Sequence, residues 1–142
     1  MSVYQNILVA IDLGDSSATV VQQASALAQL CEAKLTVMHV VNYSPSPNTS
    51  SMTASVDEAE KKLTDAARNQ IEELLQKEAL DSGVGMLITS GKARVEIARV
   101  AEKENVDLLV VGAHVSKGLA DLFGSTAKSV LDQVKCNVLV VR

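Results

Sequence analysis

The sequence predicts an α/β domain: an open, five-stranded parallel sheet of the Rossmann-like type with helices on both faces. Three observations support this fold class. Five short runs rich in Val, Ile and Leu alternate with long amphipathic stretches, an order typical of parallel strands joined by right-handed crossovers. Most runs are apolar at nearly every position, as expected for strands covered on both faces. The length of 142 residues suits one domain, so we expect residues 1–142 to share a single core.

The first two predicted strands, residues 7–11 and 35–41, flank a helix. Residues 14–17 read Gly-Asp-Ser-Ser and offer turn and N-cap chemistry at the start of this helix. Apolar residues then recur every three or four positions and predict one buried stripe: Val20, Val21, Ala24, Leu27, Ala28 and Cys31.

The second strand is followed by a long loop and a second helix. Residues 42–54 are rich in Ser, Thr and Asn and contain both prolines, which remove backbone donors and disfavour regular structure. Residues 55–58, Ser-Val-Asp-Glu, resemble a capping box that opens the helix, and residues 81–83 are expected to end it. The predicted buried stripe of this helix is Leu63, Ala67, Ile71, Leu74 and Leu75.

The last part of the chain supplies three more strands, at residues 86–89, 106–111 and 136–141. A third helix lies between the first two of them, with Val95, Ile97, Ala98 and Ala101 as its apolar positions. Residues 112–123 are predicted as a loop that leads into a fourth helix, with Val130, Leu131 and Val134 facing inward.

Composition excludes several classes of partner. Acidic residues (17) outnumber Lys plus Arg (13), and no basic stripe is visible, so nucleic acid is not an expected partner. The start of the chain lacks a basic signal region, and no apolar run approaches the length of a membrane span. We therefore predict a cytoplasmic protein without membrane contact. Cys31 and Cys136 are expected to be buried, reduced thiols.

The topology predicts where a ligand would bind. In open parallel sheets, ligands bind outside the carboxyl ends of the strands, where the strand order reverses. If the first strand is central, the second and third strands lie on one side and the last two on the other. The crevice would then have Ala10 and Asp12 on one side and Gly112 on the other.

The start of the fourth predicted helix is a candidate anion site, formed by Gly124, Ser125 and Thr126. Free backbone N–H groups and the positive end of a helix dipole favour phosphate, and the two hydroxyls add donors. The ordinary alternative is that Gly112 only turns the chain and that Gly124-Ser125 only caps the helix. The glycine spacing alone does not decide between them.

Several motifs occur together in a specific order: residues 6–12, 34–41, Gly91, 106–114, 124–127 and 136–142. In these motifs the chain resembles the universal stress protein (UspA) family over its whole length. The resemblance implies an adenine nucleotide alpha hydrolase-like fold with sheet order 3-2-1-4-5, a homodimer and a role in the stress response. The last strand, apolar on both faces, would be an exposed edge unless it paired with its copy across a two-fold axis.

The same resemblance implies an adenine nucleotide, ATP or AMP, and leaves open whether Mg²⁺ accompanies it. Ala10 and Asp12 would flank adenine and ribose, with the Asp12 carboxylate accepting from a ribose hydroxyl. Val40 would contribute backbone contact to the base. The residues that would surround the phosphates are Gly112, Gly124, Ser125 and Thr126. From the residues alone, Asp12 could instead cap the first helix, and Val40 could be plain core.

The phosphate motif departs from the ATP-binding branch of the family. Val115 replaces a glycine, and eight residues separate it from Gly124, one fewer than in the family's pattern. A β-branched residue there narrows the approach of backbone to phosphate. A second function therefore stays open, namely the same dimer without nucleotide, acting as a protein-interaction or structural stress factor.

Catalytic groups are sparse. The two His and two Cys lack the spacing of metal ligands, and the sequence shows no nucleophile paired with a general base. We therefore expect at most weak ATP hydrolysis. His39 is predicted to be a hydrogen-bonded histidine in the core or at the sheet end. His114, beside the phosphate motif, could donate to phosphate or cap a turn.

Overall fold

The computed structural model describes residues 3–41, 53–80, 83–112 and 133–142. They form one parallel sheet in the order β3-β2-β1-β4-β5, which confirms the predicted fold class and strand order. The strands are β1 (Asn6–Ala10), β2 (Lys34–Val41), β3 (Gly85–Ser90), β4 (Leu108–Gly112) and β5 (Asn137–Val141).

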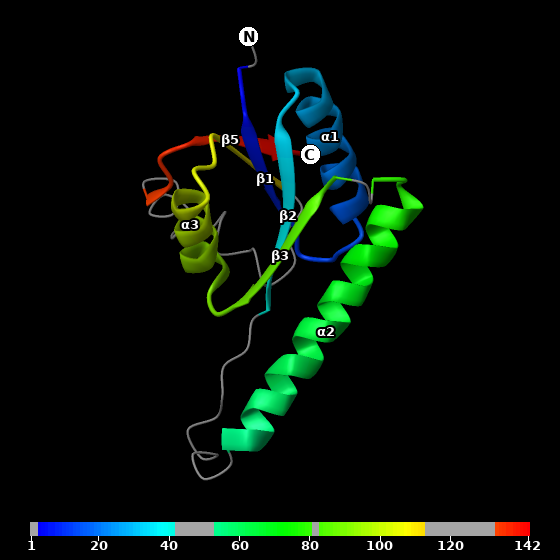
Figure 1. Cartoon of the computed structure of the whole chain (residues 1–142), viewed down its shortest axis with the longest axis vertical. Coiled ribbons are helices and arrows are strands. Elements are labelled where there is room, and N and C mark those ends of the chain that lie inside the picture. The colour runs from blue at the N-terminus through cyan, green and yellow to red at the C-terminus, as the bar shows by residue number, and fades with distance from the viewer. Residues whose placement is uncertain (1–2, 42–52, 81–82, 113–132) are drawn as a thin grey trace.

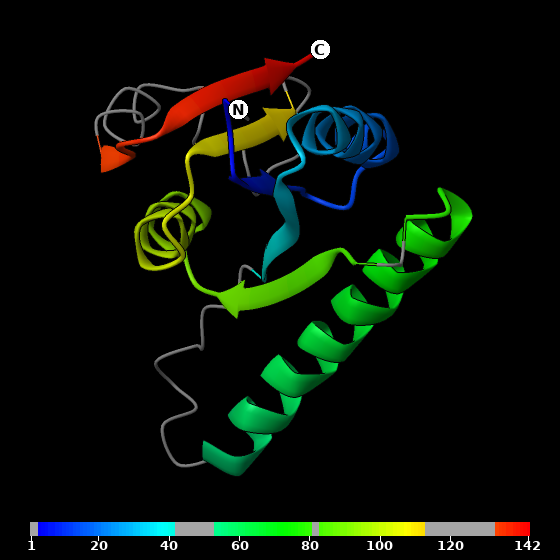
Figure 2. The ribbon, with the colours of Figure 1, turned by 45° about the horizontal axis from the view of Figure 1, so that its top comes forward.

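Three described helices cover the two faces of the sheet (Figures 1 and 2). α1 (Ser17–Cys31) and α2 (Thr53–Lys77) lie on one face, and α3 (Ala93–Lys103) lies on the other. Strand β1 shows why both faces must be covered. Ile7 and Val9 belong to the core under α1 and α2, whereas Leu8 and Ala10 belong to the core under α3.

The central strands are the most buried part of the sheet. Every residue of β4 is buried, and in β1 only Asn6 is partly exposed. This burial on both faces explains why both segments are apolar without alternation. Consecutive elements cross over from strand to strand, so the carboxyl ends of all five strands lie along one edge of the sheet.

Helix α2 differs from its prediction in where it begins, in where it ends and in how much of its apolar stripe is buried. It begins at Thr53, two residues before the expected capping box, and ends at Lys77 rather than at residues 81–83. Its amino-terminal half extends past the sheet (Figure 1), so Leu63 remains 45% exposed and its predicted burial was wrong. Among the described side chains of α2, those that meet the core lie in its carboxyl-terminal half: Ala67, Ile71 and Leu75 are buried, and Leu74 is partly buried beside them.

Helix α3 has a narrow buried stripe. Ile97, Val100 and Ala101 are buried, a spacing of three and four residues that keeps them on one side of the helix. Val95, another apolar position of this helix, lies off that side and is 48% exposed.

The two cysteines are free thiols, but both are only partly buried, so the prediction of full burial was wrong. Cys31 is the last residue of α1, and Cys136 lies just before β5, where it packs against the core under α3. Each sits at the end of an element, where the core is only partly closed.

The end of the chain is described from residue 133 onward. Val134 is buried, as predicted, whereas the rest of the predicted fourth helix and the loop before it lie outside the described residues. Strand β5 lies at an edge of the described sheet, with Leu139 38% and Val140 43% exposed. No described helix combines the length and apolar composition that a bilayer crossing demands.

Candidate functional site

The carboxyl ends of β1 and β4 meet at the point where the crossovers change direction along the sheet. Ala10 pairs with Val111, so the residues that follow each strand lie side by side. One small hollow opens there. Of the predicted site residues, Ala10, Asp12 and Gly112 all line it. The chain thus brings three of the predicted residues together at a typical ligand position of such sheets.

A tight turn fixes the Asp12 carboxylate beside this hollow. Oδ1 of Asp12 accepts from the Gly14 N–H at 2.8 Å and from the Ser17 hydroxyl at 3.2 Å. Leu13, between Asp12 and Gly14, adopts the left-handed region with φ of +64°, which few non-glycine residues do. A Cβ on Gly14 would lie 3.0 Å from Asp12 Oδ1, so glycine lets the carboxylate fold over the turn.

The Asp12 carboxylate lies both at the start of α1 and beside the hollow. Ser17 is the first residue of α1, so its bond to Asp12 ties the carboxylate to the start of that helix. The side chain also lines the hollow. A carboxylate offers about four acceptor positions, so it can accept from a ligand while it keeps these bonds.

Val40 lies where β2 continues beyond the end of β1. The ladder between these strands ends at the Ala10–Met38 pair, and the Ile11 N–H then donates to the Met38 carbonyl at 2.9 Å. Main-chain groups of successive strand residues point to alternate sides. Because Met38 faces β1, Val40 directs its N–H and C=O to the same side, past the last pair of that ladder.

The side chain of Val40, unlike its main chain, belongs to the core. It is partly buried and packs against the core under α3. Val40 is not among the residues that line the hollow beside Asp12. The core interpretation therefore describes the Val40 side chain, and the backbone-contact hypothesis concerns only its main chain.

His39 joins the ends of β1 and β2. Its Nδ1 donates to the Ile11 carbonyl at 2.8 Å, which confirms the prediction of a hydrogen-bonded histidine at the sheet end. A carbonyl oxygen can only accept, so Nδ1 carries the hydrogen. The sequence could not show this bond, because it depends on β1 and β2 ending at different levels.

Two carboxylates, those of Glu60 and Glu96, lie at the carboxyl end of β3. The Ser90 hydroxyl donates to Glu60 Oε1, and Glu96 forms an ion pair with Arg99 at 2.9 Å. The Arg99 guanidinium lowers the pKa of Glu96, so this carboxyl is ionised at neutral pH.

The remaining predicted phosphate contacts, Gly124, Ser125 and Thr126, lie outside the described residues, as do His114 and Val115. They stay predictions. Within the described part of the chain, no group of three His, Cys, Asp or Glu side chains is placed to hold a metal ion.

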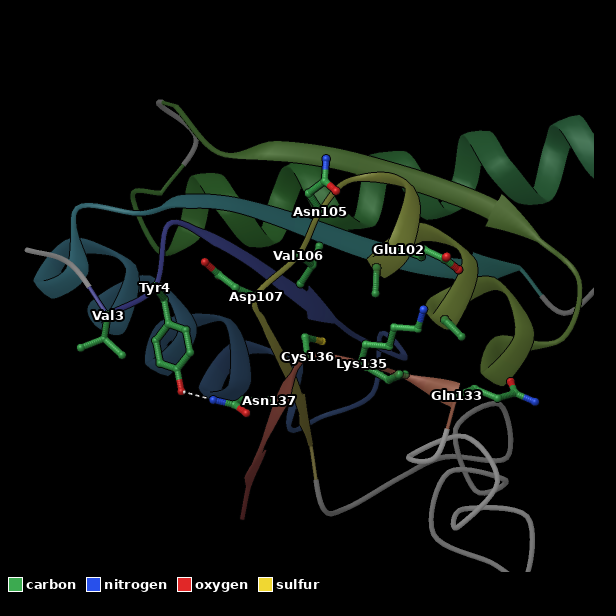
Figure 3. A pocket seen from close by; sticks show the side chains of 13 residues that line it. Val3, Tyr4, Glu102, Asn105, Val106, Asp107, Gln133, Lys135, Cys136 and Asn137 are labelled. Carbon is green, nitrogen blue, oxygen red and sulfur yellow. Dashed lines mark hydrogen bonds between the residues drawn. The ribbon is translucent and has the colours of Figure 1, made fainter.

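A larger hollow, of about 500 Å³, lies at the opposite edge of the sheet, at the amino ends of β4 and β5 (Figure 3). Some of its polar groups bond to the protein itself. Asp107 accepts from the N–H groups of Gln5 and Asn6 at 2.8 and 3.0 Å, and the Asn137 amide donates to the Tyr4 hydroxyl at 3.0 Å. Burial raises the pKa of the Cys136 thiol, so it is a poor nucleophile at neutral pH.

Comparison with known proteins decides the family. A family model described as the universal stress protein family matches residues 3–142. The chain belongs to this family. Universal stress protein A homolog 1 of Coxiella burnetii is 34% identical over 139 residues, which cover 97% of this chain and 96% of that protein.

Solved structures of the family share the fold. Universal stress protein UspA from Lactobacillus plantarum is 28% identical, with a TM-score of 0.78 and coverage of 98% of both chains. A universal stress protein solved in complex with cAMP is 27% identical, with a TM-score of 0.62, and the match covers 99% of this chain and 98% of that one.

Proposed function

We propose that this universal stress protein binds an adenine nucleotide at the carboxyl ends of β1 and β4. The observation that carries the proposal is the hollow that Ala10, Asp12 and Gly112 line together. The related structure in complex with cAMP supports an adenine nucleotide as the ligand class. ATP and AMP are the nucleotides that we expect.

Each described residue has a role that its geometry supports. The Asp12 carboxylate, fixed by Gly14 and Ser17, accepts from a ribose hydroxyl. The Val40 main chain offers one donor and one acceptor, which match the acceptor N1 and the donor N6 on the edge of adenine. Gly112 has no side chain to obstruct the space beside Ala10.

The phosphates extend from the ribose toward Gly124, Ser125 and Thr126 in this proposal. The amides at the start of the predicted fourth helix and the two hydroxyls would supply the donors. The substitution Gly124→Val is expected to abolish nucleotide binding, because a branched side chain would fill the space that phosphate needs.

Thermal unfolding with and without nucleotide tests the proposal. A ligand that binds only the folded state stabilises it by about 2.7 kcal/mol at one hundred times its dissociation constant. We expect millimolar ATP or AMP to raise the unfolding midpoint, and parallel samples with Mg²⁺ and with EDTA show whether the metal contributes. An unchanged midpoint with both nucleotides would contradict the proposal.

The second candidate function is a homodimer that acts through its surfaces without nucleotide. The observation in its favour is the exposed edge of β5, where Leu139 and Val140 are both more than one-third exposed. Pairing of β5 with its copy would satisfy the edge and cover these side chains.

Light scattering with size-exclusion chromatography tests the dimer. The wild-type chain should elute at twice its mass of 15.0 kDa, and Leu139→Glu should shift it toward the monomer. Leu30→Glu is a matched control, because Leu30 is 84% exposed on α1, away from β5. A wild-type monomer would rule out this interface.

A further inference from the structure

The two central strands β1 and β2 separate one hydrogen bond earlier than a regular ladder would. After the Ile11 N–H bonds Met38, the next bond of a parallel ladder would run from the Val40 N–H to the Ile11 carbonyl. The described residues do not form this bond, and the ladder ends at Ala10 and Met38. The His39 imidazole donates to the Ile11 carbonyl instead.

This replacement leaves the Val40 N–H available at the end of the sheet. A strand carbonyl that already accepts at 2.8 Å from a side chain is a weaker target for the neighbouring amide. The Val40 N–H, which points to that side, is therefore kept out of the ladder. The imidazole comes from the residue just before Val40, so one short segment both makes the bond and presents the amide.

The same bond acts on the ribose side of the site. Ile11 immediately precedes Asp12, and its N–H and C=O are both held by β2, through Met38 and His39. The backbone thus enters the turn at Leu13 from a fixed position. That turn has a left-handed residue and depends on the Asp12 carboxylate, so a fixed entry limits its alternatives.

We infer that His39 is a positioning residue for nucleotide: by occupying the Ile11 carbonyl, it keeps the Val40 amide available to the base and fixes the approach to Asp12. The inference rests on the proposed function for its ligand. The separation of β1 from β2 concerns the nucleotide-free protein and is measured without any ligand.

Matched variants separate the hydrogen bond from the bulk of the side chain. His39→Asn retains a donor at the position of Nδ1, whereas His39→Leu has nearly the shape of asparagine without the donor. His39→Val is a second variant without a donor and suits a strand. All are compared with wild type by thermal unfolding, so that only folded proteins enter the comparison.

Amide exchange at Val40, followed by NMR without nucleotide, is the first measurement. In His39→Leu and His39→Val the freed Ile11 carbonyl should accept the Val40 N–H, which slows exchange roughly fivefold or more. Wild type and His39→Asn should exchange at the same faster rate. Equal exchange in all four proteins would overturn the inference.

Binding of AMP, measured by calorimetry, is the second measurement. The two variants without a donor should bind roughly tenfold more weakly, and His39→Asn should stay within about threefold of wild type. Equal affinity in all four proteins would also overturn the inference. If wild type itself binds no AMP, the proposed function fails, and the exchange rates at Val40 alone then decide whether His39 holds the strands apart.

Discussion

The two edges of the sheet each carry an aspartate next to a hollow, and the two aspartates are used differently. At the amino edge, both oxygens of Asp107 accept main-chain N–H groups of the segment that enters β1. At the carboxyl edge, Oδ1 of Asp12 accepts from the Gly14 N–H and from the Ser17 hydroxyl in the turn before α1. The larger hollow lies beside Asp107 and the smaller beside Asp12. The proposed site is thus the smaller hollow, chosen for its place in the sheet topology and not for its size.

The largest expected effect comes from Asp107→Ala. This change removes the acceptor of two main-chain amides that tie β1 to the start of β4, and should lower the free energy of unfolding by about 2 kcal/mol. Urea denaturation measures the loss, with Asp65→Ala on the exposed side of α2 as the control. The affinity for AMP should not change. A large loss of affinity would place ligand binding at the amino edge instead.

The next largest effect is that of Asp12→Ala, and it distinguishes Asp12 from Asp107. Asp12→Ala should weaken binding of AMP roughly tenfold or more, because a ribose hydroxyl loses a charged acceptor. Its cost in stability should be smaller than that of Asp107→Ala. Calorimetry measures the affinity, and urea denaturation measures the stability of the same samples. Wild-type affinity in Asp12→Ala would remove Asp12 from the site.

The thiol at the amino edge gives a smaller, pH-dependent effect. Burial raises the pKa of Cys136, so alkylation should be slower than that of a free cysteine near pH 8 and should accelerate only at higher pH. By linkage, the protonated thiol favours the folded state, and this contribution is lost as the pH rises above the pKa of the unfolded chain. The alkylation rate of Cys136 is measured against pH by mass spectrometry on Cys31→Ser protein, in which Cys136 is the remaining thiol. Reaction at the rate of free cysteine would show an open, reactive hollow.

The smallest expected effect is that of Gly14→Ala. The new Cβ would stand 3.0 Å from Asp12 Oδ1, so the carboxylate must move by a few tenths of an ångström. We expect AMP affinity to fall only about threefold, less than in Asp12→Ala. The unfolding midpoint without ligand should change little. A loss as large as that of Asp12→Ala would mean that the turn, rather than the carboxylate, carries the affinity.

Much of the fold follows from local patterns in the sequence. The apolar runs of β1 and β4 identify central strands because burial on both faces leaves no alternation. Leu63 and Val95 show the limit of such patterns. Periodicity identifies an apolar side of a helix, but only the tertiary structure decides how far the sheet extends beneath it.

The candidate site could likewise be predicted only in part. Ala10, Asp12 and Gly112 could be predicted as neighbours because parallel strands bring their carboxyl ends together. The bond from His39 to Ile11 and the two bonds to Asp107 could not. They join segments far apart in the sequence and depend on the exact level at which strands begin and end.

One NMR titration tests the central claim most directly. AMP is added to isotope-labelled protein, and the amide signals of both sheet edges are followed. The account predicts saturable shifts at Asp12, Val40 and Gly112, with Gln5, Asn6 and Asp107 unchanged. Shifts confined to the amino edge, or no shifts at millimolar AMP, would contradict it.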